Sequence, residues 1–186
     1  REEPLADQEP LPLPDVLENG IGGPADQIGR DLDAIEILQV ALAHEERARA
    51  FYERMAQRHG DSTAGDLFAF LTREEEGHIR RLTGRYGIPE FEKKWQEKFL
   101  PYLIDLDRLA LEDGLGTQYT TGQEAVRRGL GIARKAESHA IAFYAQSGKI
   151  VEDKKTKTLL AELEEEERNH LVKIEGYLAD LPPEPR

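Results

Sequence analysis

Two short sequences, Glu75-Glu-Gly-His78 and Glu167-Arg-Asn-His170, place a carboxylate and an imidazole three positions apart. On a helix this spacing puts both side chains on one face, so that both can reach the same ion. A further glutamate precedes each pair by 30 residues, and the whole arrangement recurs after 92 residues. The six residues are Glu45, Glu75, His78, Glu137, Glu167 and His170. Each half of the chain thus supplies one Glu and one Glu-x-x-His.

Together these residues form a donor set suited to two metal ions. Four carboxylates carry a charge of about −4, which balances two divalent cations, and oxygen-rich ligation with one nitrogen each suits iron or manganese. We therefore predict two metal ions per site, either Fe, Mn or a mixed Fe/Mn pair. A competing interpretation is an acidic surface in which the Glu runs 74–76 and 164–167 face water. That interpretation explains the composition but not the 92-residue repeat.

Helical periodicity predicts the elements that carry these residues. Apolar residues recur at alternating spacings of three and four along four segments, and the ligand residues interrupt the middle of each apolar stripe. Lone buried carboxylates are costly unless they are paired or bound to a metal. The first stripe contains Leu32, Ile35, Leu38 and Leu42. The predicted helices begin near Asp31 or Asp33, Thr63, Gln123 and Asp153, and end near Gly60, Arg85, Ser147 (with Gly148 as the stop) and Ala179.

Two regions outside these helices differ in composition. Residues 1–30 are rich in Pro and Gly, which predicts an extended N-terminal arm. Residues 88–121 form a connection broken by Pro and Gly, and a link of this length needs a role of its own, such as carrying the chain along a bundle. Trp95, within it, is expected to pack on the bundle or on a partner subunit. We expect an all-α fold: a four-helix bundle over 31–181, made of two helical hairpins joined by a long crossover.

Counting from the predicted turns places the ligands at one height. Glu45 lies 15 residues before Gly60 and Glu75 lies 15 residues after it. At a helical rise of about 1.5 Å per residue, both lie roughly 23 Å from the loop of an antiparallel hairpin. The midpoint between Glu137 and Glu167 is residue 152, again in a predicted turn. Each hairpin therefore supplies half of the site, and packing the hairpins about a two-fold axis brings the halves together.

Other polar and aromatic residues have weaker signals. Tyr52 and Tyr144 follow the lone glutamates by seven residues, so both should point inward near the site. One alternative is that each packs in the core as an apolar ring with a polar hydroxyl at its end. The other is that each donates a hydrogen bond to a ligand carboxylate or to bound peroxide. His44, His59 and His139 have no counterpart in the other half, and we expect them at the surface.

Composition excludes several classes of function. The formal net charge of −12 argues against nucleic acid as a partner, because phosphate recognition needs clusters of Lys and Arg. The absence of cysteine excludes disulfides, Fe–S clusters and thiol catalysis. No apolar run approaches the ~20 residues that cross a membrane, and no signal peptide is visible, so we expect a cytoplasmic protein that does not enter membranes. The chain begins at Arg1 rather than at Met, which leaves open that a leader has been removed.

Over residues 33–85 and 125–177 the chain resembles the rubrerythrin branch of the ferritin-like superfamily. The shared pattern is a helix with a Glu and a following Tyr, then a Glu-x-x-His, present twice. The resemblance implies that the six residues are di-iron ligands, with Glu75 and Glu167 as the bridging pair. It also implies a homodimer or a higher homo-oligomer.

Two departures from that family bear on function. Rubrerythrins carry a four-cysteine rubredoxin-like domain, which this cysteine-free chain lacks, so electrons would come from an external donor. They also carry an extra Glu three residues after the third-helix ligand, where this chain has Ala140, with Ala48 as its counterpart in the first half. The extra carboxylate is linked to peroxide reduction, so the six-ligand site is closer to that of simple ferroxidases.

The expected function is a di-iron oxidoreductase that reacts Fe(II) pairs with O2 or hydrogen peroxide, as a ferroxidase or a peroxidase, in iron or oxidative-stress handling. The alternatives are a non-catalytic iron-binding or storage protein, and a structural helical module whose site is a relic.

Overall fold

The computed structural model describes residues 32–86, 99–115 and 122–182, and within these ranges the chain is helical with no strand. The expected all-α class is confirmed. The long helices are α1 (Ala34–His59), α2 (Thr63–Tyr86), α5 (Gly122–Ile150) and α6 (Lys154–Asp180). The arm predicted at 1–30 and Trp95 lie outside the described residues.

The first hairpin begins and turns at residues of suitable type. Asp33 caps α1 through a capping box, in which Glu36 N donates to Asp33 Oδ1 at 2.8 Å and Asp33 N donates to Glu36 Oε2 at 3.1 Å. Gly60 ends the helix with φ of 49°, a left-handed value that favours glycine. A Cβ on Gly65 would lie 2.0 Å from the carbonyl oxygen of Gly60, so the turn into α2 requires glycine there.

The second hairpin corrects one predicted boundary. Helix α5 continues through Gly148 to Ile150, and Val151 N still donates to Ser147 O at 3.0 Å. A glycine inside a helix costs only about 1 kcal/mol relative to alanine, so packing of the helix overrides it. Helix α6 begins as predicted, because Asp153 accepts hydrogen bonds from Thr156 N at 2.7 Å and from Thr156 Oγ1 at 2.8 Å.

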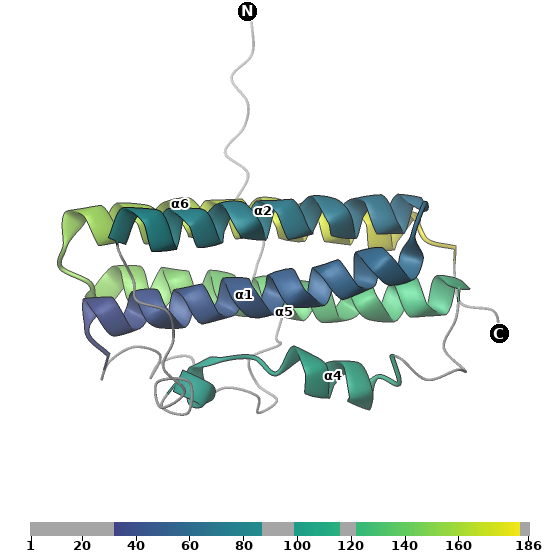
Figure 1. Cartoon of the computed structure of the whole chain (residues 1–186), viewed down its shortest axis with the longest axis horizontal. Helices are drawn as coiled ribbons and strands as arrows, with labels where there is room; N and C mark the ends of the chain where they lie inside the picture. The colour runs from purple at the N-terminus through teal and green to yellow at the C-terminus, as the bar shows by residue number, and fades with distance from the viewer. Residues whose placement is uncertain (1–31, 87–98, 116–121, 183–186) are drawn as a thin grey trace, which may run out of the picture.

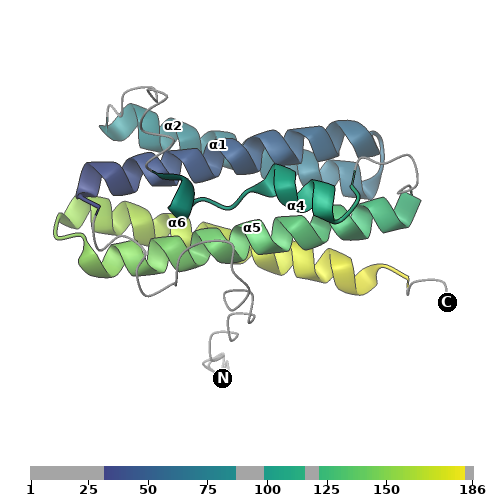
Figure 2. The same ribbon diagram turned by 90° about the horizontal axis from the view of Figure 1, so that it is seen from below.

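The long helices lie side by side as two antiparallel hairpins (Figure 1). Most of the packing is α1 against α2 and α5 against α6, and α1 also contacts α5. In the connection between the hairpins, the 3-10 helix η3 (Leu100–Tyr102) and the short helix α4 (Leu106–Glu112) are described. Figure 2 shows this part of the connection running along α1 and α5, and α4 contacts both. The connection therefore covers the face of α1 and α5 that lies away from α2 and α6 (Figure 1).

Two apolar clusters occupy the two ends of the interior. One contains Leu42, Phe143 and Leu160, and the other contains Phe68 and Leu130. The residues predicted to bind metal lie in the middle of their helices, between these clusters. Ile35 was expected on the inward stripe but is 61% exposed, because Ile37 and Leu38 take the inward positions of the first turns.

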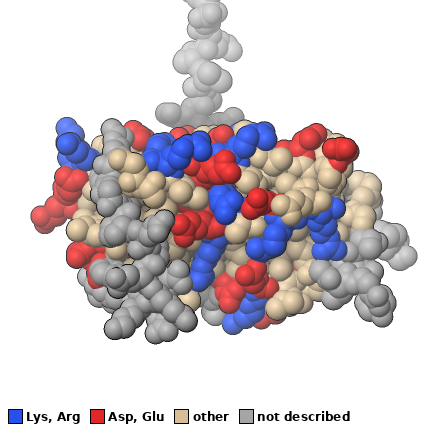
Figure 3. Space-filling model, viewed as in Figure 1, with Lys and Arg blue, Asp and Glu red and all other residues tan. Residues whose placement is uncertain are grey.

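Charged residues of both signs are interspersed on the face of the molecule drawn in Figure 3. Several pair along one helix, for example Arg49 with Glu53 at 3.1 Å and Arg168 with Glu164 at 2.7 Å. Pairs of this kind along one helix contribute about 0.3–0.5 kcal/mol each, so they add little to stability. Within the described ranges, no helix combines the length and the apolar character that crossing a membrane requires.

Candidate metal centre

The six predicted ligand residues come together at the middle of the long helices, each 1–2% exposed. Glu45 comes from α1, Glu75 and His78 from α2, Glu137 from α5, and Glu167 and His170 from α6. The competing interpretation, in which the acidic runs only face water, is therefore wrong for Glu75 and Glu167. A burial this complete needs compensation, since an isolated ionised carboxylate is very costly inside a protein.

The side chains form two groups whose ligand atoms lie within 4.8 Å of one another. The first group is Glu45, Glu75, His78 and Glu167, and the second is Glu75, Glu137, Glu167 and His170. Glu75 and Glu167 belong to both groups, in the place expected of bridging carboxylates. The two groups can thus hold a metal ion each.

Several oxygens of this centre lack a hydrogen-bond donor. His78 Nδ1 lies 2.9 Å from Glu45 Oε2 and 3.1 Å from an oxygen of each of Glu75 and Glu167, yet one ring nitrogen carries at most one proton. Among the described residues, both carboxylate oxygens of Glu75 and Oε1 of Glu167 have no hydrogen-bond partner. Buried polar atoms are rarely left so. Converging carboxylate oxygens without donors are what a cation would satisfy, so the residues present fit a bound metal.

The carboxylates disturb one another's protonation. Burial, and then repulsion by Glu167, raises the pKa of Glu137 to about 8. Burial and the neighbouring carboxylates of Glu167 and Glu45 also raise the pKa of Glu75 well above its ordinary value. Burial acts on Glu167 in the same sense, but hydrogen bonds from His170 and His78 outweigh it and lower its pKa. Without metal, the centre therefore holds protons on some carboxyl groups and charge on others.

The two imidazoles are the counter-ions of the metal-free centre. Burial alone would lower the pKa of His170, but hydrogen bonds to Glu137 and Glu167 raise it to about 10. Burial likewise opposes protonation of His78, and Glu45, Glu166 and Glu167 overcome it and raise that pKa. The rings stack with centroids 5.5 Å apart. Because ligation needs neutral imidazole, a metal ion would displace these protons.

Tyr52 and Tyr144 both reach the centre, and each bonds to a ligand carboxylate of the other hairpin. Tyr52 Oη donates to Glu137 Oε1, and Tyr144 Oη donates to Glu45 Oε1. Burial and the adjacent carboxylates raise the pKa of both phenols well above the ordinary value, so both remain donors at neutral pH. Of the two alternatives for these tyrosines, the structure shows the hydrogen bond to a ligand carboxylate, and the two bonds tie the hairpins together across the site.

Removing either phenol should weaken metal binding without removing a ligand. Tyr52→Phe frees Glu137 to turn, and we expect Mn2+ affinity to fall by about 10-fold, since outer partners of metal ligands are worth about 10–100-fold. Isothermal calorimetry measures the change. Tyr177→Phe, a half-buried tyrosine of α6 outside the centre, is the matched control and should bind as the wild type does. Equal affinities in Tyr52→Phe and wild type would show that the bond only packs the core.

The acidic residues beside the outer nitrogens of the two histidines were not predicted. His78 Nε2 lies 2.9 Å from Glu166 Oε2, and Arg81 holds that carboxylate with both terminal nitrogens, one at 3.1 Å. On the other side His170 Nε2 lies 3.9 Å from Glu74 Oε2, beyond hydrogen-bond distance. Glu74 and Glu166 are themselves 92 residues apart, so the repeat could have identified them. The two halves thus orient their imidazoles unequally.

The expectation that His44 and His139 lie at the surface was wrong. They are 5% and 6% exposed, with ring centroids 4.9 Å apart. The outward faces of α1 and α5 are covered by the connection, so those faces do not meet water as in a simple bundle. Burial lowers the pKa of both, to about 4 for His139. His59 is half-buried against Phe68, with ring centroids 6.0 Å apart.

Comparison with protein-family models, with curated proteins and with solved structures gave no match. What the chain does must therefore be argued from the geometry of this centre.

Proposed function

We propose that this chain is a ferritin-like four-helix bundle of the rubrerythrin type whose two buried groups hold a pair of iron ions that react with hydrogen peroxide or O2. The observation that carries the proposal is that two four-residue groups share Glu75 and Glu167. A chance cluster of buried acids would not repeat at 92 residues and also converge in space.

The donor set suits iron or manganese. It offers carboxylate oxygens with one imidazole per group, and both metals accept such oxygen-rich ligation. Manganese fits the same donors, and a mixed pair stays an alternative. A bound ferrous pair would supply two electrons, enough to reduce H2O2 with two protons to two waters while two Fe(II) become two Fe(III).

The chain's own residues have three roles in this proposal. The six ligand residues would hold the ions, with Glu75 and Glu167 common to the two groups. Tyr52 and Tyr144 fix the carboxylates of Glu137 and Glu45, and the Arg81–Glu166 pair fixes the ring of His78. The apolar clusters at both ends exclude bulk water, which strengthens every charge interaction in the centre. Repeated turnover as a peroxidase needs an external electron donor.

Anaerobic loading followed by stopped-flow mixing tests the proposal. We expect two ferrous ions per chain, and an absorbance change that saturates at one H2O2 per two irons. Many irons per chain in a large shell would instead identify a storage protein. A chain that binds no iron, and whose stability is unchanged by chelator, would show that the centre is a relic.

A further inference from the structure

A small recess lies beside the carboxylates of the metal centre. None of the residue roles proposed above involves it. Its volume is about 10 Å3, enough for one water-sized molecule. Its walls are the four ligand glutamates and six further residues. The six are His44, Ala48, Ile104, Leu106, Ala136 and Ala140. We call it the alanine recess.

The alanine recess lies where the two halves of the chain meet. Ala48 on α1 and Ala140 on α5 are 92 residues apart, as are His44 and Ala136. Neither imidazole of the metal centre lines the recess, so it opens on the α1 and α5 side of the centre. Because alanine stands at both 48 and 140, the space beside the shared carboxylates is kept open rather than filled by a side chain.

Besides the glutamates, the lining contains one polar side chain, His44, with a ring nitrogen that has no hydrogen-bond partner among the described residues. His44 is 5% exposed, and its Nε2 has no hydrogen-bond partner within the part of the chain that the structure describes. The His44 ring also forms a hydrogen bond with the backbone of Tyr102. Apart from the four ligand glutamates, His44 is the one side chain in the lining that can form a hydrogen bond, and its neighbours there are apolar.

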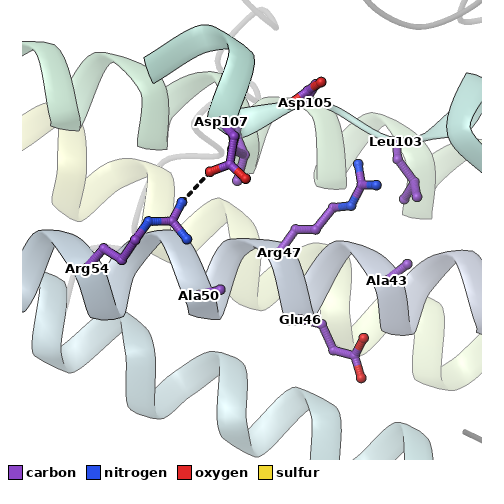
Figure 4. Close-up of a pocket in the computed structure, with 9 residues that line it drawn as sticks. Ala43, Glu46, Arg47, Ala50, Arg54, Leu103, Asp105 and Asp107 are labelled. Carbon is purple, nitrogen blue, oxygen red and sulfur yellow. Dashed lines mark hydrogen bonds and ion pairs between the residues drawn. The ribbon is translucent and has the colours of Figure 1, made fainter. Parts of the chain in front are cut away.

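A larger pocket on the surface adjoins the recess. It has a volume of about 280 Å3 and lies between α1 and the connection, as Figure 4 shows. Arg47 and Arg54 extend from α1 toward the connection, where Arg54 pairs with Asp107 and Arg47 Nη1 donates to Ile104 O at 3.2 Å. Leu106 lines both the pocket and the alanine recess, so this side chain is the wall between them.

We propose that the alanine recess receives one oxygen atom of the oxidant beside the carboxylates, that the surface pocket is its entrance, and that Leu106 limits entry to the smallest oxidants. This inference rests on the proposed function and names its substrate class: hydrogen peroxide or O2, but not organic hydroperoxides.

Size and polarity both support this assignment. A recess of about 10 Å3 has no room for an alkyl group beside the reacting oxygens. Away from the four glutamates and His44, the recess is lined by apolar groups: the methyl groups of Ala48, Ala136 and Ala140 and the side chains of Ile104 and Leu106. These groups cannot replace the water molecules of a hydrated cation. A small neutral molecule loses little on entering such walls, and His44 Nε2 can accept a hydrogen bond from peroxide.

Two substitutions should change access in opposite directions. Ala48→Leu fills the recess, and we expect the reaction of the ferrous protein with H2O2, and its association with the diatomic probe nitric oxide, to slow by at least about tenfold. Leu106→Ala opens the wall, and we expect the rate with tert-butyl hydroperoxide to rise by at least about tenfold relative to that with H2O2. Stopped-flow absorbance measures each rate, and nitric oxide association reports access without turnover. In the wild type, parallel H2O2 and O2 runs show which oxidant reacts faster.

Metal content separates failure of this inference from failure of the proposed function. Calorimetry with Mn2+ should give two ions per chain in both variants. The control is Ala161→Leu, the same exchange at an exposed position of α6, which should also bind two ions and leave every rate unchanged. Unchanged rates in Ala48→Leu with full metal content would contradict the assignment of the recess as the place that receives the oxidant. Unchanged selectivity in Leu106→Ala would contradict the role of Leu106 in limiting entry. If Ala48→Leu does not fold, Ala48→Val and Leu106→Ala carry the test. A wild-type chain without iron overturns the proposed function itself.

Discussion

Glu75→Ala protein is expected to bind neither metal ion, whereas Glu45→Ala protein is expected to retain one. Glu75 belongs to both ligand groups and Glu45 to only one. Outer partners of ligands alone are worth about 10–100-fold in affinity, so losing a shared ligand should cost at least about 100-fold at both positions. Titration with Mn2+ followed by calorimetry, and iron content after anaerobic loading, give the stoichiometry directly.

The matched control is Glu76→Ala, next to Glu75 on α2, whose side chain is 45% exposed and pairs only weakly with Arg80 at 4.0 Å. It should bind two ions with wild-type affinity. If Glu75→Ala still bound two ions per chain, the ligand assignment would be wrong. If Glu45→Ala lost both ions, Glu45 and Glu75 would be equivalent, and the idea of a shared carboxylate would have to be abandoned.

The metal-free protein should lose stability as pH rises from about 6.5 to 10. In the folded metal-free chain the pKa of His170 is raised from 6.5 to about 10, so its contribution to stability is complete below pH 6.5 and is lost as pH rises through 10. The pKa of Glu137 is raised from 4.5 to about 8, so this group too favours the fold less as pH rises from 4.5 to 8. Both effects have the same sign. We expect the melting temperature to fall by about 10 °C over this range.

Bound metal should remove this loss. Because a metal ion replaces the protons of the imidazoles and carboxyl groups, Mn2+ should stabilise the fold most at high pH and release protons when it binds. Circular dichroism melts from pH 6 to 10, with chelator and with Mn2+, measure the difference. Calorimetry in buffers of different ionisation enthalpy counts the protons. A metal-free melting temperature that rose over this range would contradict the protonation scheme.

The helices themselves needed only local information. Asp33, Gly60 and Asp153 mark element boundaries through their own backbone and side-chain bonds, and the structure places each where the sequence predicts it. Gly148 did not behave this way. Its local cost is small, and the packing of α5 against α6 outweighs it, which no local rule reveals.

Most of the centre was also predictable, because the repeat carries three-dimensional information. Residues equidistant from a turn must lie opposite one another, so Glu45 and Glu75 could be placed together by counting alone. The same repeat held Glu74 and Glu166, which were overlooked because acidic runs usually face water.

By itself, therefore, the sequence determined which six side chains meet at the middle of the helices, because helical periodicity and the 92-residue repeat fix their face and height. Only the tertiary structure decided what covers α1 and α5. Packing of the connection at Ile104 and Leu106 depends on contacts distant in sequence, which leave no periodic signal. That packing buries His44 and His139, and it shapes the alanine recess beside the carboxylates.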